Sequence, residues 1–179
     1  GLPVFVYGHS MGSLLALLFT LDHQDRIAGL VQSGTPLKLD SRTPGPLADA
    51  GIALAGLLPK LRAIAVKPTD VIAEPQAAAA YAADPLVDTK PMRLGMVMGI
   101  VREARRVRPD LTRLTLPLLV IHGGDDRVTP VSGAHSLDEH AASTDKTLKI
   151  YPRSRHEVHH DYDREAMIAD LAGWLTAHC

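Results

Sequence analysis

Short apolar runs alternate with helical patterns at both ends of the chain. Four runs have the length and composition of buried strands, and they cover residues 2–7, 27–33, 117–122 and 146–151. Leucines recur through residues 11–22 at the spacing of a largely buried helix. A second, amphipathic helix near the end of the chain carries on one face Met167, Ile168, Leu171, Trp174 and Leu175. This alternation predicts an α/β fold, with a mostly parallel sheet flanked by helices on both faces. We expect residues 2–7 to be buried on both sides of that sheet.

The middle of the chain has a different pattern. From about residue 36 to residue 109 we find no convincing strand, and prolines divide the stretch into short helical pieces. One piece, residues 51–65, is apolar with Lys60 and Arg62 at one end. It is either a helix packed on its own domain or a lid that lies on a lipid surface. We therefore expect a helical insertion between two strands of the sheet.

Composition narrows the class of protein. With 179 residues, 46% of them hydrophobic, the chain can bury a sizeable core. A net charge of −1 and 4% aromatic residues disfavour a nucleic-acid partner. The single cysteine, Cys179, forms no disulfide within the chain. Because Gly1 is followed at once by an apolar run, we expect the natural chain to begin further upstream. Any signal peptide would lie there, so the compartment is unknown, with a cytoplasmic or membrane-peripheral location favoured.

Residues 8–12 read GHSMG, an instance of G-x-S-x-G. The motif follows a predicted buried strand and opens a predicted apolar helix, so Ser10 would sit on a sharp turn with its hydroxyl exposed above the sheet. Side chains in place of Gly8 and Gly12 should collide with neighbouring backbone. The backbone amide of Met11, at the start of the helix, should donate to a developing oxyanion. The motif thus predicts a nucleophilic serine.

A nucleophilic serine needs a general base and an acid that orients it, in the chain order serine, acid, histidine. Residues 122–130, HGGDDRVTP, follow the third predicted strand and offer as the acid Asp125 or Asp126. Residues 151–161, YPRSRHEVHHD, follow the fourth strand and contain three histidines. We expect His156 to be the base, because it comes first after the strand.

The other histidines have less favoured roles. We expect His159 and His160 to begin the last helix and to face solvent, and His9, beside the serine, to point away from it. The three histidines near the end could also be metal ligands. That alternative is disfavoured because neither a cysteine nor a second carboxylate–histidine group supports it. No metal and no organic cofactor is expected.

The three loops together resemble the monoacylglycerol lipase and lysophospholipase group of α/β-hydrolases, through the segments GHSMG, GGDDRV and YPRSRHE. Residues 80–87, AYAADPLV, and 33–40, SGTPLKLD, resemble segments of that family's cap and of its junction with the sheet. The resemblance covers nearly the whole chain. It implies that Ser10 is the nucleophile and His156 the base. It also implies that Asp126 is the acid, since the family pattern G-x-x-D-R-V is counted from Gly123.

The resemblance further implies the C-terminal part of an α/β-hydrolase fold with a helical cap. Residues 1–35 would form the part of the core with the nucleophile, residues 36–110 the cap, and residues 111–179 the part with the acid and base loops. Two departures stand out. Ser13 replaces the family's second glycine after the motif, and a serine is small enough for close helix packing. The N-terminal strands, and the HG loop that supplies the other oxyanion donor, are missing, and His122–Gly123 lies in the acid loop and cannot replace that loop.

The implied reaction is acyl transfer through a serine ester, which water then hydrolyses. The implied substrate is a monoacylglycerol, a lysophospholipid or a similar single-chain lipid ester, with transient membrane contact through the cap. Two alternatives stay open: a general carboxylesterase or thioesterase with the same triad, and, for the isolated chain, a non-catalytic binding module. A dehalogenase is disfavoured, because its nucleophile would be an aspartate at position 10.

Overall fold

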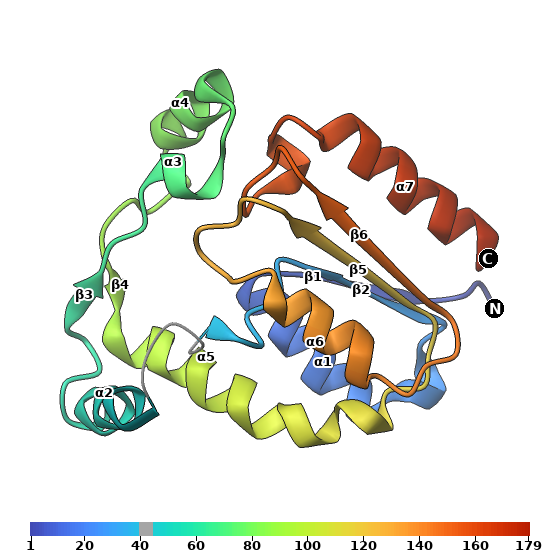
Figure 1. Ribbon diagram of the computed structural model, residues 1–179, viewed down its shortest axis with the longest axis horizontal. Helices are drawn as coiled ribbons and strands as arrows, with labels where there is room; N and C mark the ends of the chain where they lie inside the picture. The colour runs from blue at the N-terminus through green and yellow to red at the C-terminus, as the bar shows by residue number, and fades with distance from the viewer. Residues whose placement is uncertain (40–44) are drawn as a thin grey trace.

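The computed structural model describes residues 1–39 and 45–179. Its centre is a parallel sheet of four strands in the order β1-β2-β5-β6 (Figure 1), which are β1 (Phe5–His9), β2 (Gly29–Ser33), β5 (Leu118–Gly123) and β6 (Lys146–Tyr151). The expected parallel sheet flanked by helices is confirmed. Residues 40–44 of the expected insertion, which include Asp40 at the end of the segment 33–40, lie outside the described residues.

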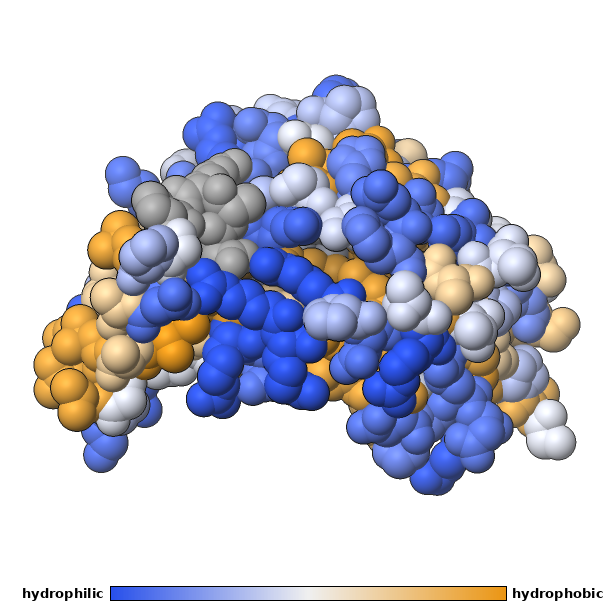
Figure 2. Space-filling model, turned by 60° about the horizontal axis from the view of Figure 1, so that its bottom comes forward, coloured by the Kyte–Doolittle hydropathy of each residue, from blue (hydrophilic) through white to orange (hydrophobic). Residues whose placement is uncertain are grey.

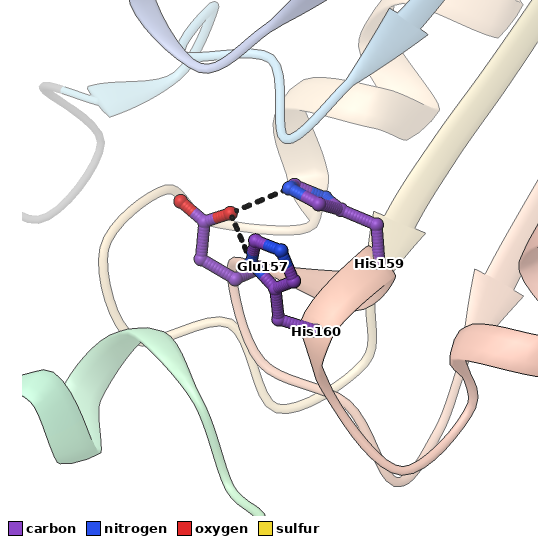
Figure 3. Close-up of side chains that lie close together, drawn as sticks. All are labelled: Glu157, His159 and His160. Carbon is purple, nitrogen blue, oxygen red and sulfur yellow. Dashed lines mark ion pairs between the residues drawn. The ribbon is translucent and has the colours of Figure 1, made fainter. Parts of the chain in front are cut away.

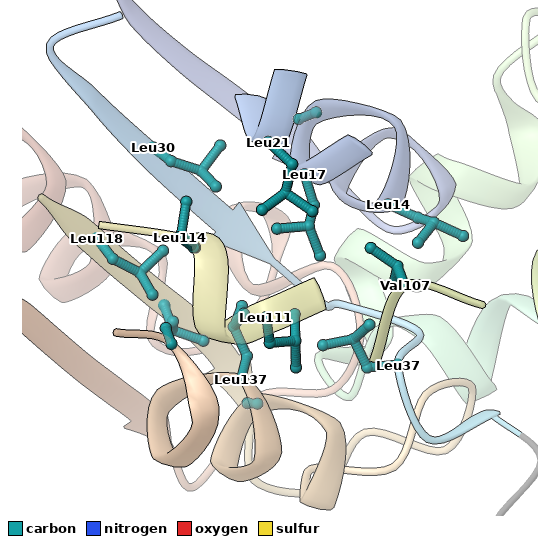
Figure 4. Close-up of a cluster of buried hydrophobic side chains, with 14 of the residues drawn as sticks. Leu14, Leu17, Leu21, Leu30, Leu37, Val107, Leu111, Leu114, Leu118 and Leu137 are labelled. Atoms are coloured by element: carbon teal, nitrogen blue, oxygen red, sulfur yellow. The ribbon is translucent and has the colours of Figure 1, made fainter. Parts of the chain in front are cut away.

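The two central strands send alternate side chains to opposite faces of the sheet. One face meets α1 (Met11–Asp22), α6 (Ser132–His140) and the 3₁₀ helix η3 (Arg108–Arg113) in a core of mainly leucines (Figure 4). This core contains from the two strands Leu30, Leu118 and Val120. The other face meets α7 (Arg164–Ala177) through Val31, Leu119 and Ile121. Burial on both faces explains why these strands read as continuous apolar runs.

The terminal helix α7 packs on the sheet much as its pattern predicts. Met167 and Trp174 are buried, and Leu171 and Leu175 pack against them half-buried. Ile168 was expected on the same face, but it is 53% exposed. Successive residues point about 100° apart around a helix, so burying Met167 turns its neighbour toward the edge of the contact.

Strand β1 is less buried than expected. Its first two residues are half-buried and Tyr7 is 44% exposed. Residues 2–4, predicted to belong to the strand, precede it and are exposed. The prediction of full burial is therefore wrong for the described residues, among which β1 lies at the edge of the sheet with β2 as its neighbour.

The middle segment contains short helices and one small antiparallel sheet. Its elements are α2 (Gly45–Leu57), β3 (Arg62–Ile64), α3 (Pro68–Val71), α4 (Pro75–Ala83), β4 (Met92–Arg93) and α5 (Leu94–Val107). The expectation that this stretch holds no strand is wrong, because β3 pairs with β4. Strands of three and two residues are too short to leave an alternating pattern in the sequence. A further 3₁₀ helix, η1 (Gln24–Arg26), follows α1.

The predicted helical piece over residues 51–65 ends early. Helix α2 stops at Leu57, because the residue before Pro59 is pushed out of the helical conformation. Apolar side chains along this helix and just after it are exposed, namely Leu47, Leu54, Leu57, Leu58 and Leu61. In Figure 2 hydrophobic surface gathers at the left end of the molecule, where α2 lies. Within the described residues, every helix is too short or too polar to cross a bilayer.

The carboxyl ends of the four parallel strands meet at one edge of the sheet. Ser10 follows β1, Gly34 follows β2, Asp126 lies just after β5, and His156 lies in the loop after β6. Loops at this edge are where parallel sheets build their binding sites. The fold therefore gathers residues that are up to 146 positions apart in the sequence.

Candidate active site

The turn between β1 and α1 holds Ser10 in a strained conformation. Ser10 has φ 54° and ψ −123°, and among the described residues other than glycine only Ser10 has a positive φ. Such backbone strain costs roughly 1–3 kcal/mol and persists only where surrounding contacts hold it. Two hydrogen bonds do so here: Ser10 N–H donates to Ser33 O at 2.9 Å, and buried Ser13 donates its hydroxyl to Ser10 O at 2.7 Å.

The two glycines of the motif differ in what surrounds them. A Cβ built on Gly8 would lie 2.5 Å from Gly12 O and 2.6 Å from Ser13 Cα, closer than atoms can approach. Gly8 is therefore required where β1 passes under α1. A Cβ on Gly12 would meet nothing within 4 Å in the described residues. The expected collision is thus found at Gly8, and the expectation for Gly12 is wrong.

The structure brings together Ser10, Asp126 and His156. The Ser10 Oγ lies 2.8 Å from His156 Nε2, and His156 Nδ1 lies 2.8 Å from Asp126 Oδ2. The carboxylate accepts only, so Nδ1 carries the proton and the lone pair of Nε2 is left to accept from the hydroxyl. His156 is 3% exposed. This arrangement can draw a proton from Ser10 and thereby make its oxygen a nucleophile.

Asp126 is buried and surrounded by hydrogen-bond donors. Its Oδ1 accepts from the backbone N–H of Val128 and of Thr129, each at 2.8 Å. Its Oδ2 accepts from the Thr129 hydroxyl at 2.8 Å, besides His156. Burial alone would raise the pKa of Asp126, but hydrogen bonds from His122 and His156 outweigh it and hold that pKa well below its usual range. The carboxylate is therefore ionised at neutral pH.

His122 contacts the carboxylate of Asp126. Its ring is fully buried, and its Nε2 lies 3.2 Å from Asp126 Oδ2 and 3.1 Å from Thr129 O. Both oxygens accept only, so Nε2 carries the ring's proton and donates to them. His122 thereby adds a further donor to the carboxylate that positions His156.

The alternative acid, Asp125, lies at the surface and not against the imidazole. It is exposed, and it pairs with Arg155 at 3.0 Å and with Arg127 at 3.2 Å. The Arg155 guanidinium, followed by that of Arg127, lowers the pKa of Asp125. The structure thus places Asp126 at the imidazole and Asp125 in a surface ion pair.

His9 faces away from the serine, toward the far side of the base loop. Its Nδ1 lies 3.2 Å from Ser33 Oγ, and its Nε2 lies 3.2 Å from Glu157 Oε1. Its ring packs on His156 with the centroids 4.8 Å apart. Burial lowers the pKa of His9, so the ring fills space beside the base chiefly in its neutral form.

His159 and His160 lie in the 3₁₀ helix η4 (Val158–His160), ahead of α7 and not at its start. The ring of His160 is exposed, as expected. The ring of His159 is half-buried and lies 2.9 Å from Glu157 Oε2, so the expectation that it faces solvent is wrong. Burial would raise the pKa of Glu157, but hydrogen bonds from His159 and His9 lower it well below its usual range.

The sequence alone did not single out Gly34, His122, Thr129 or Glu157. Gly34 has φ +58°, and a Cβ there would lie 2.9 Å from the His156 ring. A polar residue at the end of an otherwise apolar strand, as His122 is, was the one available signal. The partners of Thr129 and Glu157 are distant in the sequence, so their roles appear only in the fold.

Two cavities flank Ser10. One, of about 200 Å³, also touches His156 and has a mixed lining that includes Lys67, Tyr81, Lys90 and Glu157. The other, of about 250 Å³, lies on the side of Met11 and is mostly apolar, lined among others by Leu39, Ile64, Val97 and Ile100.

Met11 is the first residue of α1, so its N–H has no acceptor within the helix.

Comparison with known proteins places the chain among hydrolases. The serine aminopeptidase S33 family matches residues 1–163. Monoacylglycerol lipase of Mycolicibacterium smegmatis is 29% identical over 177 residues, which are 99% of this chain and 63% of that protein. Human monoglyceride lipase is 33% identical over 162 residues, which are 89% of this chain and 53% of that protein.

A solved structure agrees with these relatives. The crystal structure of Paleococcus ferrophilus monoacylglycerol lipase superposes with a TM-score of 0.87 at 26% identity, over 99% of this chain and 69% of that one. The chain spans less than two thirds of the length of either relative named above.

The difference between the two glycines gives a direct test of the turn. Gly8→Ala should lower the free energy of unfolding by at least about 1–3 kcal/mol, because backbone atoms of α1 cannot move aside. Gly12→Ala, in the same motif, should be neutral or stabilise by up to about 1 kcal/mol, because alanine favours a helix over glycine. Chemical denaturation of both variants would measure this. Equal losses in the two variants would contradict this description of the turn.

Proposed function

The chain belongs to the serine aminopeptidase S33 family, and from this membership and its geometry we propose that it carries the catalytic triad of a serine hydrolase that cleaves carboxylic esters. The observation that carries the proposal is the continuous chain of hydrogen bonds from Asp126 through His156 to Ser10, each link 2.8 Å. Hydroxyl, imidazole and buried carboxylate in this order are the parts that acyl transfer through a serine ester requires.

In the proposed mechanism, Ser10 Oγ attacks the ester carbonyl while His156 Nε2 takes its proton. The ionised Asp126 keeps Nδ1 protonated and stabilises the imidazolium that forms. The N–H of Met11 donates to the developing oxyanion, aided by the positive end of the α1 dipole. His156 then passes the proton to the leaving alcohol, and water, activated by the same imidazole, hydrolyses the serine ester.

We assign the substrate from the two cavities and the relatives. The apolar cavity on the side of Met11 suits one acyl chain, and the mixed cavity beside His156 suits the polar alcohol part. Residues 36–110 supply most of the lining of both, which supports their role as a cap that limits access. Two relatives are named for monoacylglycerol. Monoacylglycerol or a lysophospholipid is therefore the proposed substrate. A general carboxylesterase or thioesterase would instead turn over short-chain esters or thioesters faster than monoacylglycerol.

The triad can be tested with four proteins. Wild type should release fatty acid from monoacylglycerol and should be labelled at Ser10 by a fluorophosphonate probe. Ser10→Ala should lose both activities, and Asp126→Asn should lower kcat on the order of 10⁴-fold, because the imidazole loses its orienting acid. Asp125→Asn is the matched control and should stay within about two-fold of wild type, since Asp125 is exposed.

Two results would refute this assignment. One is full labelling of Ser10→Ala at another residue. The other is a crippled Asp125→Asn beside a nearly normal Asp126→Asn.

The exposed leucines around α2 support peripheral contact with a lipid surface. Leu57 is 79% exposed at the end of the helix, and Lys60 follows it in the next turn. Apolar side chains with a basic rim suit an interfacial segment. Such contact would hold the segment that lines both cavities at the membrane from which a lipid ester comes.

A charged substitution at Leu57 should distinguish an effect on membrane contact from an effect on the hydrolysis step itself. Leu57→Asp should hydrolyse monoacylglycerol in phosphatidylcholine vesicles about five-fold or more slowly, because the aspartate resists insertion. It should hydrolyse water-soluble nitrophenyl acetate at the wild-type rate. Ile168→Asp, an exposed apolar position on α7, is the control and should leave both rates unchanged. A wild-type vesicle rate in Leu57→Asp would show that this face does not dock.

A further inference from the structure

A cluster of one carboxylate and two imidazoles lies beside the base loop, outside the triad. It consists of Glu157, His159 and His160, whose side chains converge as Figure 3 shows. Glu157 Oε2 lies 2.9 Å from His159 Nε2 and 3.7 Å from His160 Nδ1. The three atoms all lie within 4.8 Å of one another.

We propose that this cluster is a binding site for a divalent transition-metal ion of the Zn²⁺ class. Imidazole nitrogens and a carboxylate oxygen are the ligands that Zn²⁺ takes when no thiolate is present. Zn²⁺ binds such atoms at about 2.0–2.2 Å, so neighbouring ligand atoms of a tetrahedral site lie roughly 3.3 Å apart. The separations of 2.9 and 3.7 Å lie on either side of this value. The third separation, between the two imidazole nitrogens, is at most 4.8 Å, so the exposed His160 side chain must rotate inward to form three ligand bonds, with water as the fourth ligand.

The hydrogen bonds of the cluster leave room for a cation. His160 Nδ1, at 3.7 Å, is too far from the carboxylate for a hydrogen bond. His159 Nδ1 is buried without a partner among the described residues. His159 Nε2 lies 2.9 Å from Glu157 Oε2, which only accepts, so Nε2 carries the ring's proton and donates it to the carboxylate. An ion that binds Nε2 and Oε2 replaces this hydrogen bond with two ligand bonds, and the ring's proton moves to Nδ1.

An ion can reach the cluster from solvent. His160 is exposed, and His159 and His160 border an open groove of about 470 Å³. The groove is also lined by two acidic residues, Glu74 and Asp84, and by one basic residue, Arg164. Their net negative charge attracts a cation toward the cluster.

Occupation of the site should slow hydrolysis, a consequence that rests on the proposed function. Glu157 follows the base His156 directly and lines the cavity that holds Ser10. Its other oxygen, Oε1, lies 3.2 Å from His9, whose ring packs on His156. An ion that binds Oε2 draws this carboxylate toward the groove and removes its negative charge from beside the base.

Calorimetric titration with Zn²⁺ tests the site directly. The protein should be untagged and chelator-treated and should carry Cys179→Ala, because the exposed thiol also binds Zn²⁺. We expect one ion per chain, and His160→Ala should weaken binding at least ten-fold. His140→Ala is the matched control, since His140 is an exposed histidine that faces a single carboxylate, Glu139, at 3.9 Å. Melting curves should show that both variants stay folded.

Equal affinity in His160→Ala and in the protein without that change would overturn the site, as would the absence of binding. In the ester assay, Zn²⁺ should slow hydrolysis by the protein that keeps His160, and EDTA should restore the rate. Hydrolysis by His160→Ala should not be slowed by Zn²⁺. If Zn²⁺ binds but hydrolysis is not slowed, the effect on activity is refuted, while the proposed metal site stands. A protein that binds Zn²⁺ but hydrolyses no ester would refute the proposed function instead.

Discussion

The site depends on one buried negative charge, the carboxylate of Asp126. A carboxylate removed from water costs several kcal/mol unless hydrogen bonds replace its hydration. Five donors do so here, three from its own loop and one each from His122 and His156. The carboxylate thereby joins the end of β5 to the loop after β6. It also fixes the direction of the His156 ring, which aims Nε2 at the serine.

The strained turn at Ser10 is the second constraint. It matters for the site because the Asp126 carboxylate holds the His156 ring where the raised hydroxyl can reach it. The turn lifts the hydroxyl out of the sheet toward the imidazole, and the close passage of β1 under α1 makes the turn sharp. Gly8 permits that passage, and Ser13 bonds back to the strained residue. Gly34, after the neighbouring strand, leaves the space that the His156 ring fills. Backbone conformation and side-chain chemistry thus converge on one hydrogen bond.

The sequence predicted what depends on local pattern and missed what depends on distant contacts. The strand Lys146–Tyr151 and the helix Met11–Asp22 have the predicted bounds, because apolar runs and a turn motif delimit them. The short β3–β4 pair left no periodic signal. The partner of His159 was likewise not readable, because it depends on how the loop after β6 folds back on itself. The exposure of Tyr7 depends on which strands lie beside β1.

The dependence of kcat/KM on pH tests the central claim most directly. If Asp126 remains ionised throughout, this carboxylate takes up no proton as the pH falls toward 4 and adds no inflection of its own to the profile. The logarithm of kcat/KM should then fall with a slope of about one and with a single inflection. The sign follows from the lowered pKa of Asp126, which leaves no proton on the carboxylate in this range. A slope that approaches two, or a second inflection above about pH 4 that disappears in Asp126→Asn, would show that the carboxylate titrates there and would contradict the account.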